Sequence, residues 1–200
     1  MFDQSSSREI LEAVAGKLTE NGMHTIVVPT GADARARILQ MVDPLSEVML
    51  MTSITLETMG LPQVMKDGGY TMIRDIFTNE NVSIKHKREL GAAPDVSIAS
   101  AHAVTKAGEI IIVSGTGSQM PAVAYGAGKA ILVIGAQKIV ENIEEGMKRV
   151  YEYVLPLESI RANKAYNKTT GSSVNKILMI KKEAQAGRIE VILVEEKLGF

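Results

Sequence analysis

Short apolar runs, each about as long as one β-strand, alternate with helix-length segments along this chain of 200 residues. The clearest runs are Val96–Ser100, Glu109–Val113 and Ala130–Gly135. Between such runs lie amphipathic stretches, such as the one from Val140 to Val154, whose apolar residues recur at helical spacing. This alternation predicts an α/β fold in which a mostly parallel, Rossmann-like sheet carries helices on both faces.

The C-terminal part departs from this alternation. Two apolar runs, Ile177–Ile180 and Ile189–Val194, are separated only by residues 181–188. Such a connection is too short for a helical crossover, so we expect the two runs to form an antiparallel hairpin within a mixed sheet. The chain contains no internal repeat and no linker-like segment, and we therefore expect one domain over residues 1–200.

Composition excludes several classes of function. The net charge of −1, together with the absence of Trp, argues against a nucleic-acid-binding protein, which needs basic and aromatic surfaces. The absence of Cys removes disulfides, thiol nucleophiles and cysteine ligands for zinc or iron–sulfur clusters. His24, His86 and His102 are far apart in sequence, so we expect neither a metal site nor a cofactor.

No apolar run approaches the roughly 20 residues that span a bilayer, so we expect no membrane partner. The first residues lack a basic segment followed by an apolar one, the pattern of a secretory signal. These observations favour a cytoplasmic protein.

Residues 114–121 form the most suggestive segment for ligand binding. Ser114, Thr116, Gly117, Ser118 and Gln119 follow a strand-like run and precede a possible helix that begins near Pro121. Backbone N–H groups at such a turn, with the hydroxyls, suit a phosphate or carboxylate. The alternative is an ordinary strand-to-helix turn in which glycine bends the backbone and the hydroxyls cap it, since the spacing matches no nucleotide-binding motif.

Two further loops follow predicted strands. In the first, His102 stands two residues after the Val96–Ser100 run, where it suits an acid/base or hydrogen-bonding role, or a purely structural one. In the second, Gln137 and Lys138 follow the Ala130–Gly135 run, where they suit an anion site or a plain turn with a solvated lysine. Ligands of open α/β sheets bind beyond the carboxyl ends of the strands, which is where both loops are expected.

A polar segment near the C-terminus completes the candidate site. Glu158 and Arg161 are three residues apart on a predicted helix, and we expect them to form an ion pair. The polar connector 169–173 and Asn175 follow. The connector suits a loop that folds over a ligand, or a loop with no such task.

Four long motifs of this chain resemble those of LUD-domain (lactate-utilisation) proteins. They are Ser100-x-His102-Ala103-Val104-Thr105, Thr116-Gly117-Ser118-Gln119-x-Pro121-Ala122, Gly135-x-Gln137-Lys138-Ile139-Val140 and Leu155-Pro156-Leu157-Glu158-x-x-Arg161-Ala162. The resemblance implies a fold similar to that of ribose-5-phosphate isomerase and coenzyme A transferases. It also implies a link to lactate oxidation, in which other subunits carry iron–sulfur clusters.

One position departs from the family pattern. Many LUD-domain proteins resemble coenzyme A transferases in placing a glutamate before a glycine, where this chain has Lys106. Acyl transfer through a carboxylate anhydride is therefore not expected here.

Two hypotheses follow. In the first, the chain is an enzyme or enzyme component that binds or converts a small anionic metabolite, such as a hydroxy acid or a sugar phosphate. Its catalytic residues would be His102 and Glu158, and its binding residues Ser114, Thr116, Gly117, Ser118, Gln119, Gln137, Lys138, Arg161 and Asn175. In the second, the chain is a non-catalytic subunit that docks onto a redox partner holding iron–sulfur clusters or flavin. An enzyme should gather these polar groups in one pocket, whereas a docking subunit should spread them over a flat face. Both hypotheses are compatible with a homo-oligomer.

Overall fold

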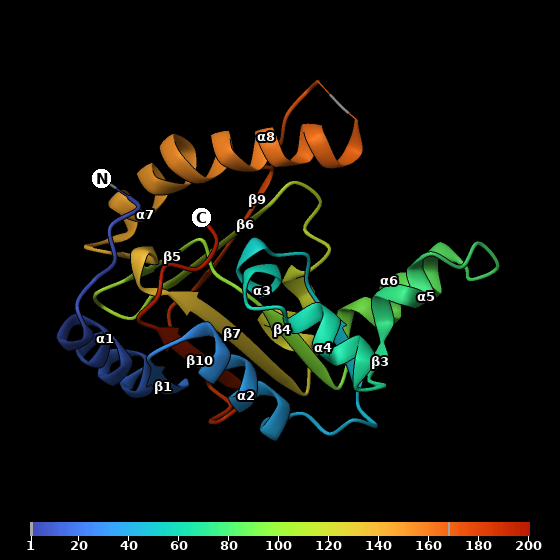
Figure 1. The fold of residues 1–200 in the computed structure, drawn as a ribbon, viewed down its shortest axis with the longest axis horizontal. Coiled ribbons are helices and arrows are strands. Elements are labelled where there is room, and N and C mark those ends of the chain that lie inside the picture. Colours follow the sequence, from blue (N-terminus) through green and yellow to red (C-terminus); the bar gives the residue numbers. More distant parts are fainter. Residues whose placement is uncertain (1, 168) are drawn as a thin grey trace.

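A computed structural model describes residues 2–167 and 169–200 of the chain (Figure 1). Within these residues a six-stranded sheet has the order β1-β10-β7-β4-β2-β3, and every neighbouring pair is parallel. Its strands are β1 (His24–Val28), β2 (Glu47–Leu50), β3 (Thr71–Met72), β4 (Val96–Ala99), β7 (Lys129–Gly135) and β10 (Ile189–Val194). The predicted α/β fold with a mostly parallel sheet is confirmed.

A second, four-stranded sheet of the described residues packs beside the first. Its order is β8-β5-β6-β9, and only the β5–β8 pair is parallel. The strands are β5 (Ala103–Thr105), β6 (Ile110–Ser114), β8 (Ile139–Val140) and β9 (Lys176–Ile180). The fold is therefore mixed, as expected, but the antiparallel pairs belong to a separate sheet.

The predicted C-terminal hairpin is wrong. β9 pairs with β6 in the second sheet, whereas β10 lies between β1 and β7 in the first and is parallel to both. A short connection can carry the chain from one sheet to another as well as back along the same sheet. Val191 and Leu193 pack on one face of β10, and Ile192 and Val194 pack on the other. A strand that is apolar on both sides is typical of the centre of a parallel sheet, not of a hairpin edge.

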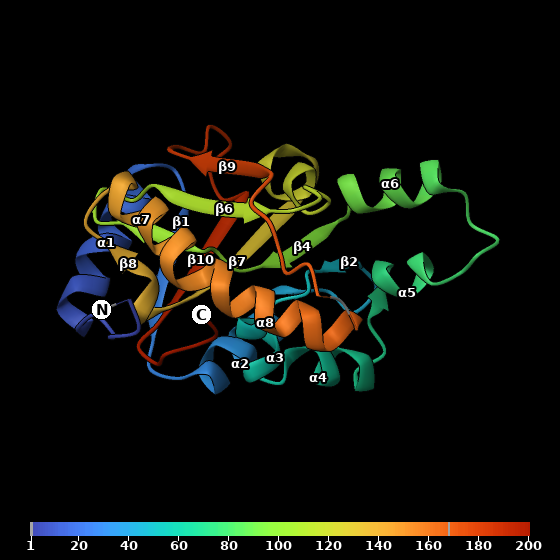
Figure 2. The same ribbon diagram turned by 90° about the horizontal axis from the view of Figure 1, so that it is seen from above.

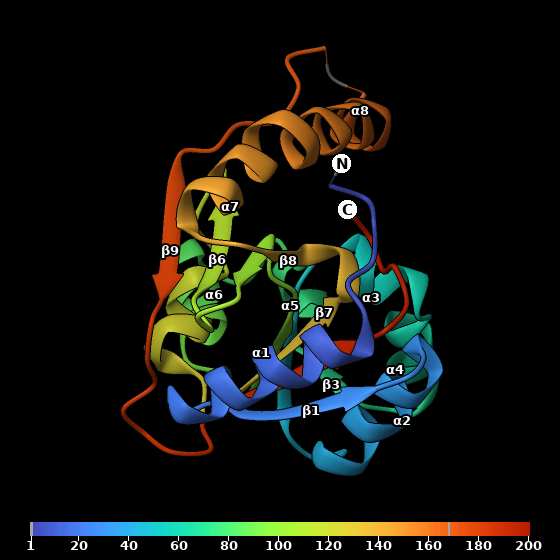
Figure 3. The ribbon, with the colours of Figure 1, turned by 90° about the vertical axis from the view of Figure 1, so that its left-hand side faces the viewer.

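Helices cover both faces of the six-stranded sheet, as predicted. α2 (Gly31–Met41), α3 (Ile54–Thr58) and α4 (Leu61–Asp67) cover one face, and α1 (Arg8–Glu20) and the second sheet cover the other (Figure 2). α7 (Ile143–Arg149) covers the outer face of the second sheet. A π-helical turn, Val150–Val154, joins it to α8 (Leu155–Tyr166), which lies across the end of both sheets (Figure 3). α5 (Ile73–Phe77) and α6 (Ile84–Ala92) form a projecting arm (Figure 1).

Helix α7 begins later than the apolar pattern predicts. Val140 belongs to strand β8, and the helix starts at Ile143, because the Asn142 side chain accepts a hydrogen bond from the Glu145 N–H at 3.0 Å and caps the first turn. None of the helices in the described residues combines the length and apolar character that crossing a membrane requires.

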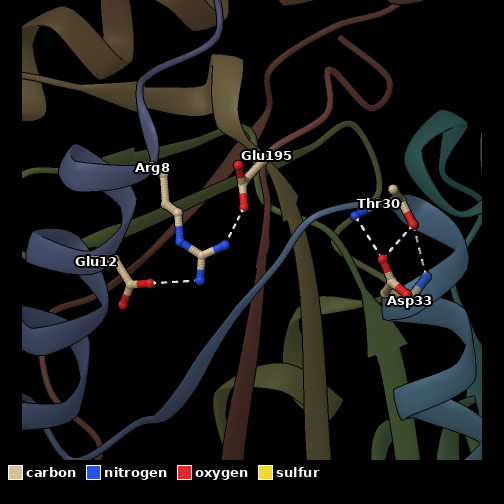
Figure 4. A network of polar contacts seen from close by, with 5 residues as sticks. All are labelled: Arg8, Glu12, Thr30, Asp33 and Glu195. Atoms are coloured by element: carbon tan, nitrogen blue, oxygen red, sulfur yellow. Dashed lines mark hydrogen bonds and ion pairs between the residues drawn. The ribbon is translucent and has the colours of Figure 1, made fainter.

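Two polar contacts of the first two helices fix where they begin (Figure 4). Thr30 and Asp33 form a reciprocal capping box at the start of α2, with the Asp33 N–H donating to Thr30 Oγ1 at 3.1 Å. Arg8, in the first turn of α1, donates to Glu12 at 3.1 Å and to Glu195, beyond β10, at 2.7 Å. The Arg8 contact ties α1 to the carboxyl end of β10.

Candidate functional site

A cavity of about 520 Å³ lies at the carboxyl ends of the parallel strands. Its walls come from the segments that follow β2, β4 and β7, from the end of β6, and from α8 with residues 171–175. Strands of both sheets therefore end at the same cavity. This is the position that the sheet architecture predicts for a ligand site.

Most of the residues predicted for the site line this cavity. They are His102, Ser114, Thr116, Ser118, Gln119, Lys138, Glu158, Arg161 and Asn175. Gly117 and Gln137 are not among the lining residues. The structure thus brings together nine residues from five separate segments of the sequence, and the cavity is a hollow with walls, not a flat face.

Lys138 is buried in the cavity wall, with 2% of its surface exposed, so the interpretation as a solvated lysine is wrong. Its Nζ donates to Thr55 Oγ1 at 2.8 Å, to Ser100 Oγ at 3.1 Å and to the Ala101 carbonyl at 3.2 Å. Burial, with the nearby positive charge of Arg149, lowers the pKa of the Lys138 ammonium to about 7. At neutral pH the group is therefore divided between ammonium and amine.

His102 presents a hydrogen-bond donor to the cavity. Its Nδ1 accepts from the Val113 N–H at 3.1 Å, which places the ring proton on Nε2. Burial, followed by the positive charges of Lys138 and Arg149, lowers the pKa of His102 to about 3. The ring is therefore neutral at physiological pH. This geometry favours a role in polarising a ligand oxygen over the role of a general base.

Arg149 supports the His102 loop from behind. Its guanidinium is fully buried, donates from Nη1 to the His102 carbonyl at 2.6 Å, and stacks on the Tyr153 ring at 5.3 Å. Burial lowers the pKa of Arg149 to about 10, which still leaves it charged near pH 7. It therefore supplies a fixed positive charge close to His102 and Lys138 without lining the cavity itself.

The loop over residues 114–119 is held mainly by its own side chains. Ser114 Oγ accepts from the Gly117 N–H at 2.9 Å, and Thr116 Oγ1 accepts from the Ser118 N–H at 3.3 Å. These two N–H groups are already bonded, so the expected backbone contribution of Gly117 and Ser118 to anion binding is reduced. The helix expected after Pro121 is a single π-helical turn, Ala122–Gly126, which is too short to provide an appreciable dipole.

The sequence pattern placed the runs before this loop and before Lys138, Glu109–Val113 and Ala130–Gly135, in one mostly parallel sheet. In the structure β6 belongs to the second sheet and β7 to the first. They border the same cavity because the two sheets end together there.

Glu158 and Arg161 form the predicted ion pair. Arg161 Nε donates to one carboxylate oxygen of Glu158 at 2.7 Å, and Nη2 donates to the other at 2.6 Å. Both oxygens of Glu158 are thus engaged, and the bidentate geometry orients the carboxylate at the cavity wall. The residue is better placed to orient a ligand than to move a proton.

The connector between α8 and β9 closes one side of the cavity. The Gly171 N–H donates to Asn163 at 2.9 Å and the Ser172 N–H to Ser159 at 3.0 Å, which anchors the connector on α8. Asn175 donates through Nδ2 to the Gly115 carbonyl at 3.1 Å. Asn175 therefore holds the 114–119 loop in place from the cavity rim.

Gln137 has a different task from the predicted one. Its side-chain amide donates to the carbonyls of Leu198 at 2.9 Å and Gly199 at 3.1 Å, and its oxygen accepts from the Leu198 N–H at 3.3 Å. Gln137 is buried, and its side chain forms hydrogen bonds with the backbone of the C-terminal segment as a neighbouring strand would. That segment in turn brings Phe200 to the cavity wall.

Sequence reasoning missed several lining residues, including Thr55, Ser100 and Arg74. The rule that ligands bind beyond strand ends should have indicated Thr55 and Ser100, because they follow β2 and β4. Arg74 carries no such signal, since it lies on the first turn of the short helix α5. Its side chain is exposed at the cavity and makes no hydrogen bond or ion pair with a residue that the structure describes.

Lys106, at the position of the family glutamate, lies away from the cavity. It pairs with Glu141 at 2.5 Å on the surface. The described residues contain no group of three His, Cys, Asp or Glu side chains arranged to hold a metal ion.

Comparisons with known proteins agree with this architecture. The chain is similar to a solved structure from Deinococcus radiodurans, a DUF162 family protein, with a TM-score of 0.59 and 17% sequence identity over 96% of this chain and 99% of that one. At this identity the likeness shows the fold alone. A sequence search among curated proteins gives no match. The family model of the LUD domain matches residues 11–194, and the chain therefore belongs to the LUD domain family.

Proposed function

We propose that the cavity binds a small anionic metabolite, such as a hydroxy acid or a sugar phosphate, and that the chain acts as an enzyme or as the ligand-binding component of one. The observation that carries this proposal is that His102, Gln119, Lys138, Glu158 and Arg161 line one cavity. Its volume of about 520 Å³ is within the usual range for small-molecule sites. A hydroxy acid such as lactate would accord with the family name.

The charges of the lining side chains support an anion. Glu158 is neutralised by Arg161, whereas Arg74 and the protonated fraction of Lys138 have no carboxylate as an ion-pair partner among the described residues. The neutral Nε2–H of His102 and the hydroxyls of Ser114, Thr116 and Ser118 add hydrogen-bond donors. A carboxylate or phosphate would provide the missing negative charge and accept these hydrogen bonds.

The alternative, a non-catalytic subunit that docks onto a redox partner, is less well supported. It expects the same polar residues to spread over a flat contact face. Their convergence on a cavity favours a small ligand, and fold similarity alone favours neither hypothesis.

A thermal-shift screen tests the proposal, because a ligand that binds only the folded state must raise its melting temperature. The probes are inorganic phosphate, L-lactate and ribose 5-phosphate. We expect at least one to stabilise the protein. Replacing Arg74 by Met should weaken binding of that ligand about tenfold or more, through loss of one charge-assisted hydrogen bond of roughly 1.5–3 kcal/mol.

Arg88→Met is the matched control. Arg88 lies on α6, in the same projecting arm, is exposed, and does not line the cavity. Arg88→Met removes the same charge as Arg74→Met. Comparing the two variants therefore distinguishes loss of a ligand contact from a general effect of net charge. Equal weakening by both variants, or no stabilisation by any of the probes at millimolar concentration, would reject an anion site in this cavity.

A further inference from the structure

Lys138 places a primary amine at the wall of the cavity with a fully defined hydrogen-bond environment. Nζ contacts two hydroxyls, of Thr55 and Ser100, and one carbonyl, of Ala101, at 2.8–3.2 Å. All three residues that supply these groups also line the cavity. The amine therefore has one fixed position, in a residue that lines the cavity of the proposed ligand.

This amine has no counter-ion. None of the ion pairs formed by the described residues involves Lys138, and the charged neighbour that acts on it is the buried cation Arg149. A buried lysine without a carboxylate, next to another positive charge, is a known arrangement for an amine that must be nucleophilic.

The two hydroxyls allow the amine to exist in either protonation state. With an ammonium, both accept from Nζ, and their own protons reach backbone carbonyls, Thr55 to Leu198 at 3.1 Å and Ser100 to Val133 at 2.6 Å. With a neutral amine, one hydroxyl can turn and donate to the nitrogen lone pair, because a hydroxyl is both donor and acceptor. If Thr55 is the hydroxyl that turns, the Leu198 carbonyl keeps its hydrogen bond from Gln137 at 2.9 Å, so loss of the proton does not leave that carbonyl unpaired.

We propose that Lys138 forms an imine with a small anionic carbonyl compound, of the 2-oxo acid class, bound in the cavity. This rests on the proposed function, because the carboxylate of such a compound would occupy the anion site near Arg74. The depressed pKa of Lys138, about 7, agrees with the geometry, since roughly half of the group is then a free amine at neutral pH.

The reaction needs no further reagent. The Nζ lone pair attacks the carbonyl carbon, a C–N bond forms, and the C=O π electrons move to the oxygen. One proton passes from this nitrogen to the oxygen through the Thr55 and Ser100 hydroxyls, which gives a neutral carbinolamine. Its hydroxyl takes up a second proton from solvent and leaves as water while the nitrogen lone pair forms the C=N bond, and the nitrogen then returns its remaining proton to solvent. One carbonyl compound and one amine give one imine and one water. His102, as a neutral Nε2–H donor at the cavity, is suited to polarise the carbonyl oxygen.

Reductive trapping tests this proposal on the full chain. The protein is incubated near pH 7 with glyoxylate or pyruvate and cyanoborohydride, which reduces an imine to a stable amine, and the labelled lysines are identified by peptide mass spectrometry. We expect Lys138 to be labelled roughly tenfold or more above exposed lysines such as Lys106, because an ordinary lysine, with a pKa near 10.4, is almost fully protonated. Lys138→Met should lose this adduct and keep the background labelling, and Lys106→Met should keep the Lys138 adduct.

The outcomes separate this inference from the proposed function. Labelling of exposed lysines with Lys138 unlabelled rejects the imine, and mapping on the unsubstituted protein gives that answer even if Lys138→Met fails to fold. If L-lactate raises the melting temperature in that case, the anion site stands without the imine. If uncharged acetaldehyde labels Lys138 as efficiently as glyoxylate does, the reactive amine stands, and the anionic substrate class and the proposed anion site are rejected.

Discussion

The stability of this protein should depend on the protonation of Lys138 in a way that one substitution isolates. The folded pKa is about 7, whereas an unfolded lysine keeps its proton to about 10.4. Between these values the unfolded state binds more protons than the folded state, so the free energy of unfolding rises with pH. Below pH 7 Lys138 is protonated in both the folded and the unfolded state, so its contribution to the free energy of unfolding no longer changes with pH.

The magnitude follows from the pKa difference. Each unit is worth about 1.4 kcal/mol, so over two units above pH 7 Lys138 should add roughly 2–3 kcal/mol to the stability of the unsubstituted protein. Lys138→Met keeps most of the buried stem but has no proton to lose. The difference in unfolding free energy between the two proteins should therefore grow by about 1 kcal/mol or more per unit between pH 7 and 9.

The difference in unfolding free energy at pH 7 is less informative than its slope with pH. Met leaves the Ala101 carbonyl without its Lys138 donor, which costs stability, but it also removes a charge that burial disfavours. These two effects oppose each other. The first is largely independent of pH, whereas the second disappears as Lys138 loses its proton and therefore appears in the slope. The slope reports the amine alone.

The assay is urea unfolding followed by circular dichroism at several pH values from 7 to 9. Other groups that titrate in this range contribute equally to both proteins and cancel in the difference. Lys106→Met is the control, because it makes the same substitution at an exposed lysine that is paired with Glu141 outside the cavity. Parallel stability curves for Lys138→Met and the unsubstituted protein would refute the buried, depressed lysine on which the site depends.

Three other substitutions test the surroundings of the cavity. For His102→Gln, the unfolding free energy of the unsubstituted protein minus that of the variant should shrink as the pH falls from about 6.5 toward 4. A folded pKa of about 3 means that only the unfolded state gains a proton at His102 in this range, which lowers the stability of the unsubstituted protein by at most ~1.4 kcal/mol per pH unit. Urea unfolding at several pH values measures this difference, and a constant value contradicts the neutral ring. Gln137→Ala should cost about 1–3 kcal/mol, because the Leu198 N–H and the Gly199 carbonyl lose the Gln137 side chain as their partner. An unchanged urea midpoint would show that these hydrogen bonds do not stabilise the fold. Gly126→Ala should destabilise by at least ~1–3 kcal/mol, because its Cβ would lie 1.9 Å from the Ala92 carbonyl oxygen, and thermal unfolding should show the lower melting temperature; full stability would mean that the turn is arranged differently.

Local patterns in the sequence were sufficient for the fold class and for most of the site. Apolar runs buried on both faces, such as Ile131–Ile134 in β7, predict central parallel strands because each residue of a strand points to one of two covered faces. Strand ends of such a sheet meet at one edge, which is why His102 and Lys138 could be assigned to a common site from their positions alone. The Glu158–Arg161 pair follows from helical spacing in the same way.

Tertiary structure decided what spacing cannot specify. The length of the 181–188 connection is the same whether the chain folds back or crosses to another sheet, so only the packing of β10 on both faces placed it between β1 and β7. Gln137 and Lys138 are neighbours in sequence, yet one binds the C-terminal segment and the other faces the cavity. Burial, not residue type, made Lys138 a partly neutral amine and His102 a neutral donor, because the cost of charge depends on solvent and on cations brought close by distant segments.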